Sequence, residues 1–371
     1  MTDIDDKILV KAAAAGQRWW ARAYYYEREF TEAYNTLGVL PPTVEPRATG
    51  HMSDMIDLIQ RILDNGHGYV VTDADGKPTG NVYFDVASWP HYGELTHQKQ
   101  TSEVDEAAAV ADRMGPSVDA TGADKYNPVD PADASPDKHD PRDFALWKAP
   151  KDTDPEDARW STPFGVGRPG WHIECSGISM KHLGEDLDIH CGGIDNAFPH
   201  HTNEIAQSEA YLGHPWCKYW FHVLHLNTNS GKMSKSKGEF LTVSLLEQKG
   251  YDPLVYRLFC LQSHYRKSLV FSFENLDNAA TTYSKLISRI AALKPEAGEA
   301  FDEAAAETLR AKFNEALGND LNTSLGVTVL YDVLKFGTNA ATKLALLGEF
   351  DAVLGLSLLP AAERSRQQGK A

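Results

Sequence analysis

One long acidic stretch of the chain cannot join a hydrophobic core, so it divides the sequence into parts. Between residues 101 and 141, ten acidic residues face only three basic ones, which places seven of the sixteen net negative charges there. The stretch is rich in Ala and Pro and almost free of large apolar residues. Such a composition cannot bury enough surface to offset the entropy of ordering the chain. We therefore predict a solvated insertion with one short helix near residues 104–114; a regulatory acidic arm is the alternative.

The chain as a whole has the composition of a folded protein. Of the 371 residues 42% are hydrophobic, enough for sizeable cores in two or three domains. No apolar run reaches the roughly 18 residues of a membrane span, and the N-terminus lacks the features of a signal peptide. Four cysteines are too few for a disulfide scaffold. These observations favour the reducing cytoplasm, and the net charge of −16 disfavours sequence-blind binding to nucleic acid.

The spacing of apolar residues predicts an α/β region followed by helices. Residues 5–37 are typical of a helix interrupted near Gly16, and residues 52–66 of an amphipathic helix. We expect a strand pair at 69–71 and 81–86, a buried strand at 187–190, a helix at 203–212 and a strand at 219–226. The last three, in that order, indicate part of a parallel α/β sheet. Four further amphipathic segments predict a helical bundle: 278–293, 304–317, 324–336 and 340–354.

Histidine and cysteine are concentrated in one window. Eight of the fourteen histidines and three of the four cysteines lie between residues 172 and 225, which is where chemistry should be sought first. Cys175, His200 and Glu204 offer thiolate, imidazole and carboxylate, all ordinary zinc ligands. His200 and Glu204 would share one face of a helix. The spacing alone is weak, since such a pair is more often on the surface and a lone cysteine more often in a core. His201 is an alternative to His200.

In a short loop at residues 230–238, two glycines bracket three lysines, and the same stretch carries three serines. Such a loop can wrap phosphates and stabilise the charge on a leaving pyrophosphate, although its composition alone favours a solvated basic turn. Its string Lys-Met-Ser-Lys-Ser, residues 232–236, is identical to a signature of class I aminoacyl-tRNA synthetases. The exact string therefore favours the phosphate-binding interpretation.

Two narrower strings are Gly-Trp-His-Ile-Glu-Cys at 170–175 and Phe-Pro-His-His-Thr-Asn-Glu at 198–204. With residues 2–8 and 45–49, they make the chain resemble the cysteinyl-tRNA synthetase family from Thr2 to about Leu359. The resemblance implies an α/β fold: an incomplete class I Rossmann-type parallel sheet with a connective insertion, followed by an all-α helical bundle. The implied segments are 1–8, a remnant of the first half of the nucleotide fold; 9–141, a connective region with the acidic insertion at about 101–141; 142–240, the second half; 241–272, a stem-contact segment; and 273–371, a tRNA-contacting bundle.

The resemblance also implies roles for residues. Cys175, His200 and Glu204 would hold one zinc ion that binds the thiolate of the substrate cysteine. Trp171, His190 and Asp195 would line the amino-acid pocket. ATP, with Mg²⁺, would be bound by Lys232, Met233, Ser234, Lys235 and Ser236, of which Lys232 and Lys235 are the catalytic residues. The implied partners are L-cysteine, ATP and tRNA(Cys), with no membrane, and the implied state is a monomer.

The sequence departs from the family at both ends. The His-Ile-Gly-His signature and a fourth zinc ligand, a cysteine, would lie upstream of Met1, and the C-terminal end is also short. We therefore expect the 371-residue chain alone to show little or no ATP–pyrophosphate exchange. Cys191 stands where the family has a glycine, and we consider it as a replacement zinc ligand. The alternatives are a cysteine ligase of mycothiol synthesis with an amino-sugar acceptor, and a non-catalytic zinc- or tRNA-binding fragment.

Overall fold

The computed structural model describes residues 1–97, 135–228, 231–232 and 241–368. Most of the acidic insertion, its expected short helix and residues 233–236 of the lysine loop lie outside the described residues. The chain forms two compact units, each considered by itself. The first comprises Met1–Arg28 and Thr43–Val223, and the second comprises Glu29–Pro42 and Leu224–Ala371.

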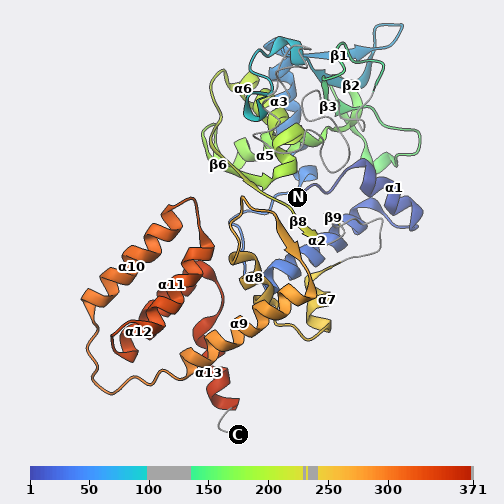
Figure 1. Ribbon diagram of the computed structural model, residues 1–371. Coiled ribbons are helices and arrows are strands. Elements are labelled where there is room, and N and C mark those ends of the chain that lie inside the picture. The colour runs from blue at the N-terminus through green and yellow to red at the C-terminus, as the bar shows by residue number, and fades with distance from the viewer. Residues whose placement is uncertain (98–134, 229–230, 233–240, 369–371) are drawn as a thin grey trace. The chain divides into compact units, whose positions relative to one another are not determined.

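The N-terminal helices follow the predicted pattern (Figure 1). α1 (Asp6–Ala14) begins where the side chain of Asp5 accepts a hydrogen bond from the backbone N–H of Ile8. α2 (Trp19–Thr36) follows after Gly16, whose φ of +63° ends the first helix. α3 (Met52–Asp64) turns its apolar stripe into the core of the first unit. The interrupted helix and the amphipathic helix are both confirmed.

A five-stranded antiparallel sheet forms one layer of the first unit. Its strands are β1 (Gly68–Thr72), β2 (Pro78–Phe84), β3 (Phe144–Lys148), β4 (Trp160–Thr162) and β5 (Gly165–Pro169), in the order β1-β2-β3-β5-β4. The predicted strand pair is β1 and β2, with Tyr69 opposite Tyr83. β5 leads through Gly170 into α5 (Trp171–Leu183), and the N–H of Gly170 donates to the carbonyl of Leu146 on β3 at 2.9 Å. The sheet therefore fixes the start of α5.

A parallel strand pair carries the other half of the site. β6 (Leu187–Gly193) runs parallel to β7 (Cys217–Val223), and α6 (Thr202–Leu212) connects them. The predicted strand–helix–strand order is therefore confirmed. The expected burial of the first strand is wrong, because only Leu187 is buried while Asp188, Ile189 and Cys191 are exposed. Among the described strands β7 is the sole partner of β6, so most of its side chains meet solvent.

Short helical turns connect these elements. Most are 3₁₀ turns: η1 (Ala48–His51), η2 (Val86–Ser88), η3 (Glu94–Thr96), η5 (Glu156–Ala158) and η6 (Ile194–Asn196). η7 (Ala197–His201) is a π-type turn that continues into α6. Within the described ranges, no helix is long and apolar enough to cross a membrane.

The second unit contains a small sheet and the helices of the C-terminal region. β8 (Leu226–Thr228) lies between parallel β10 (Leu269–Phe271) and antiparallel β9 (Gly231–Lys232). The helices are α7 (Val243–Gln248), α8 (Pro253–Leu261), α9 (Phe273–Ala291), α10 (Glu303–Gly318), α11 (Thr323–Lys335), α12 (Ala340–Leu354) and α13 (Leu358–Gln368). The four predicted bundle helices correspond to α9–α12, and α13 was not predicted. The expected α/β class with a helical C-terminal region is confirmed.

Candidate metal and amino-acid site

An unusual set of buried polar side chains lies on α6. Thr202, Asn203, Glu204, Gln207 and Ser208 are each at most 3% exposed. Polar residues are rarely buried in this number unless they are hydrogen-bonded to one another or serve a site. The Gln207 amide donates to the backbone carbonyl of His172 and to Ser176 Oγ on α5, and Ser208 Oγ donates to Ser176 Oγ at 2.9 Å. These bonds join α6 to α5.

The three predicted zinc ligands converge at this junction. Cys175 lies on α5, His200 in the turn before α6, and Glu204 in the first turn of α6. One potential ligand atom from each lies within 4.8 Å of the other two. Glu204 is fully buried, and the Nε2 atom of His200 lies 2.9 Å from its Oε1 atom. The structure thus brings together a sulfur donor from α5, a nitrogen donor from η7 and an oxygen donor from α6.

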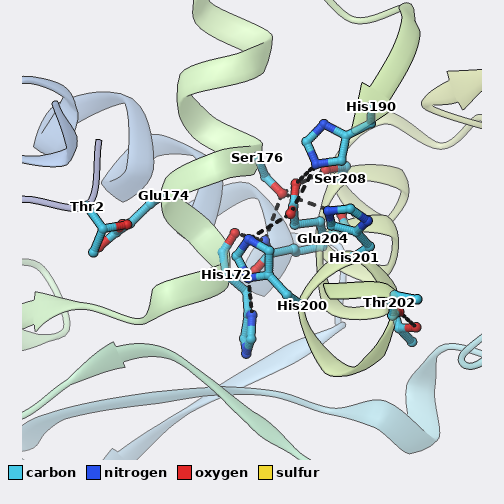
Figure 2. Close-up of polar contacts among 12 residues, drawn as sticks. Thr2, His172, Glu174, Ser176, His190, His200, His201, Thr202, Glu204 and Ser208 are labelled. Carbon is cyan, nitrogen blue, oxygen red and sulfur yellow. Dashed lines mark hydrogen bonds and ion pairs between the residues drawn. The ribbon is translucent and has the colours of Figure 1, made fainter. Parts of the chain in front are cut away.

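A second group of donors meets the same carboxylate. His190, on β6, and His201 join Glu204 in a set whose ligand atoms also lie within 4.8 Å of one another. The Nε2 atom of His190 is 3.1 Å from Glu204 Oε2. Figure 2 shows His190, His200 and His201 gathered around Glu204. The sequence had offered His201 as an alternative to His200, but the structure places each of them in its own donor group.

The electrostatics of the cluster favour a cation. Burial opposes the charge of Glu204, yet hydrogen bonds from His190 and His200 outweigh it and lower the pKa of this carboxyl to about 2. Burial lowers the pKa of His201 to about 3, and it raises the pKa of the Cys175 thiol well above its ordinary value. An ionised carboxylate therefore lies beside a neutral imidazole and a protonated thiol.

Each candidate imidazole ligand has an imidazole partner of its own. His200 Nδ1 lies 2.8 Å from Nδ1 of His172, and His201 Nδ1 lies 2.8 Å from Nε2 of His222. One ring nitrogen of each pair must carry the shared proton, so the contact restricts tautomer and ring orientation. His172 and His222 had no assigned role in the sequence analysis. Their signal was the crowding of histidine between residues 172 and 225.

The glycines that end β6 make room for the cluster. A Cβ on Gly192 would lie 2.8 Å from Cε1 of His201 and 2.9 Å from Nδ2 of Asn196. A Cβ on Gly193 would lie 2.5 Å from Oδ1 of Asp195. Both separations are too short for real atoms, so neighbouring side chains occupy the space that a larger residue here would need.

The remaining predicted residues lie at different distances from the cluster. The Trp171 ring, 45% exposed, stacks on His200 with centroids 4.2 Å apart. Asp195 is exposed beside Gly193. Cys191 is exposed and belongs to neither donor group found among the described residues. Lys232 lies in β9, whereas Met233, Ser234, Lys235 and Ser236 lie outside the described residues.

Comparisons with known proteins show which family and which relatives the chain resembles. Residues 1–281 match the family model described as the tRNA synthetases class I (C) catalytic domain. The chain is 66% identical over 351 residues to a protein named cysteine–tRNA ligase from Bifidobacterium longum, covering 93% of this chain and 64% of that protein. Its identity to a cysteine–tRNA ligase of Cutibacterium acnes is 43% over 350 residues, covering 92% and 64%. The chain thus spans about 64% of the length of these relatives.

Solved structures agree at the level of the fold. The chain is similar to Mycobacterium tuberculosis methionyl-tRNA synthetase bound by methionyl-adenylate, with a TM-score of 0.53 over 97% of this chain and 81% of that one. A second structure of the M. tuberculosis enzyme with methionyl-adenylate gives a TM-score of 0.56 over 94% and 74%. The sequence identities are 14% and 16%, so the likeness concerns the fold alone.

Proposed function

We propose, because the chain belongs to the family of the tRNA synthetases class I (C) catalytic domain, that it activates L-cysteine with ATP. The product would be cysteinyl-adenylate, from which cysteine passes to tRNA(Cys). The observation that carries the proposal is the convergence of Cys175, His200 and Glu204 within 4.8 Å. The high identity to proteins named cysteine–tRNA ligase supports the choice of amino acid.

A zinc ion fits the donor set. Thiolate, imidazole and carboxylate are the three side-chain types that bind zinc, and three protein ligands leave a position open for a substrate. When bound, zinc would supply a bond to the substrate thiolate that the hydroxyl of serine forms poorly. An apolar pocket separates substrates that differ so little by only about 1–3 kcal/mol, so the metal would be the main source of selectivity.

The surrounding residues would prepare this site for its ligands. Burial keeps the Cys175 thiol protonated in the cation-free site, so the proton must leave when a cation is taken up. His172 would orient the His200 ring, and the stacked Trp171 ring would shield it from water on one side. Asp195 would accept hydrogen bonds from the substrate ammonium.

The lysine loop would act on the other substrate. We propose that Lys232 and Lys235 contact the phosphates of ATP while the cysteine carboxylate attacks the α-phosphate. Two ammonium groups would neutralise charge that develops on the departing pyrophosphate. Positioning of the two substrates and this neutralisation would supply most of the rate.

Two cysteine variants test the zinc proposal. Cys175→Ser should lose bound zinc and any cysteine-dependent ATP–pyrophosphate exchange. Cys217→Ser, on β7 and outside both donor groups, is the matched control and should keep its zinc. Zinc content is measured by mass spectrometry after dialysis. Full zinc content in Cys175→Ser would overturn the assignment of the ligand.

A separate assay tests the reaction. Exchange is measured with L-cysteine and, as a control, with L-serine, for this chain alone and for any longer form of it encoded in the same reading frame. Exchange that depends on cysteine in either protein supports the proposal. Its absence from both, with folding verified by circular dichroism, would contradict cysteine activation.

A further inference from the structure

Two histidines that are far apart in the sequence meet on the surface of the first unit. His51 is the last residue of η1, and His182 lies in the last turn of α5. Their Nε2 atoms are 2.8 Å apart, and their ring centroids are 5.0 Å apart. That centroid separation is nearly the largest that such a contact between two ring atoms allows. The two rings therefore point nitrogen to nitrogen, and neither belongs to the donor groups around Glu204.

The backbone determines where the protons of this pair lie. His51 Nδ1 is 2.8 Å from the backbone carbonyl oxygen of Arg47. A carbonyl oxygen only accepts, so Nδ1 carries the proton and Nε2 of the neutral ring keeps its lone pair. His182 Nε2 must then donate the proton that the two rings share. The same contact between Nδ1–H and a backbone carbonyl orients histidine ligands in metal sites.

The packing of α3 against α5 brings the two rings within reach of each other. A Cβ on Gly177 of α5 would lie 3.1 Å from Cγ of Met55 on α3, so the two helices approach closely. Lys181 Nζ and Asp54 Oδ1 add an ion pair between the same helices at 3.2 Å. Both histidines are close in sequence to this ion pair. Contacts between helices therefore set the positions of the two histidines.

The distance between the two nitrogens matches one coordination geometry. A metal–imidazole bond is about 2.0 Å long, so two such bonds at a right angle span about 2.8 Å, whereas a tetrahedral angle needs about 3.3 Å. Right angles between ligands are typical of square-planar or tetragonal copper(II) and nickel(II). The contact is exposed, so the rings can tilt toward one ion and water can fill its remaining positions. The proton on His182 Nε2 would then move to Nδ1 of the same ring.

We propose that His51 and His182 form a surface chelate for a divalent metal ion that prefers tetragonal coordination, copper(II) or nickel(II). The bound ion would link the start of α3 to the end of α5. Imidazole nitrogen suits both metals, and copper(II) should bind more tightly than nickel(II), as it does at most sites built from nitrogen and oxygen ligands. The inference is independent of the proposed function, because it uses none of the residues assigned to zinc, cysteine or ATP.

Equilibrium dialysis of the full chain with nickel(II) tests the chelate. His51→Asn and His182→Asn should each bind one ion per chain fewer than the parent protein. The double variant should lose no more than either single variant, because both rings hold the same ion. His214→Asn is the matched control, since this exposed histidine also has its Nδ1 against a backbone carbonyl, that of Pro215 at 2.9 Å. The control should bind as many ions as the parent.

Two results of the dialysis would overturn the proposal. If either single variant binds as many ions as the parent, the pair does not share an ion. If the double variant loses two ions, each ring binds metal separately. Thermal unfolding gives a second readout: nickel(II) should raise Tm less in His182→Asn than in the parent, because an ion held only by the folded state stabilises it. An equal rise in both proteins would contradict the chelate.

Discussion

Gly170 lies at the junction between β5 and α5, and a methyl group there should push the helix off the sheet. An ideal Cβ at this position lies 2.0 Å from the carbonyl oxygen of Ala145 and 2.9 Å from its carbon. Carbon–oxygen contacts are normally about 3.3 Å or longer, so the start of α5 must move by about 1.3 Å. Overpacking of this kind costs about 1–3 kcal/mol, and loss of the Gly170–Leu146 hydrogen bond adds about 1 kcal/mol.

We therefore expect Gly170→Ala to lower the free energy of unfolding by about 2–4 kcal/mol, a fall in Tm of about 5–15 °C. The shift should also move Cys175 away from His200 and Glu204 and weaken metal binding. Gly50→Ala is the matched control, since its Cβ would meet nothing within 4 Å and its backbone is not left-handed. Urea denaturation followed by circular dichroism measures both proteins. Stabilities within 0.5 kcal/mol of each other would refute the steric argument.

Three further changes test other parts of the fold. Phe350→Ala, in the core of the helical region, should cost about 3–5 kcal/mol in urea denaturation; a cost below about 1 kcal/mol would contradict that packing. Burial tends to raise the pKa of Asp6, but a hydrogen bond from Lys151 and nearby positive charges outweigh burial and lower this pKa. Ionised Asp6 therefore stabilises the fold above its unfolded pKa of 3.8, and that stability is lost as the pH falls. Asp6→Asn should therefore lower Tm at pH 7, with a difference that shrinks below pH 3.8; a constant difference would argue against it. Burial raises the pKa of Glu209, so Glu209→Gln should leave Tm at pH 7 unchanged or higher, and a clear fall would contradict this.

Local patterns predicted most elements because each pattern reports a nearby physical constraint. The three- and four-residue spacing in α3 predicts which face is buried, and the left-handed φ of Gly16 explains the break between α1 and α2. The burial of β6 was predicted wrongly. Burial of a strand depends on what covers it, and no sequence pattern within residues 187–190 carries that information.

The candidate site also combines features that the sequence predicts with features that it does not. Cys175, His200 and Glu204 could be named from the sequence, because few side-chain types bind zinc and the sequence strings around these three residues are specific. Which atoms meet could not be named, because α5, β6 and α6 contribute side chains that are far apart along the chain. The contacts of the Glu204 carboxylate with both His190 and His200 follow from that packing.

The sequence by itself determined the family, many of the helices, some of the strands, and the residue types available for binding a metal. These follow from local periodicity and from strings of fixed spacing, which need no knowledge of distant contacts. Only the tertiary structure decided that His172 and His222 orient other imidazoles, that Gly192 leaves space for His201, and that one carboxylate oxygen lacks a hydrogen bond. Those properties depend on distances of a few ångströms between separate elements, and packing alone sets such distances.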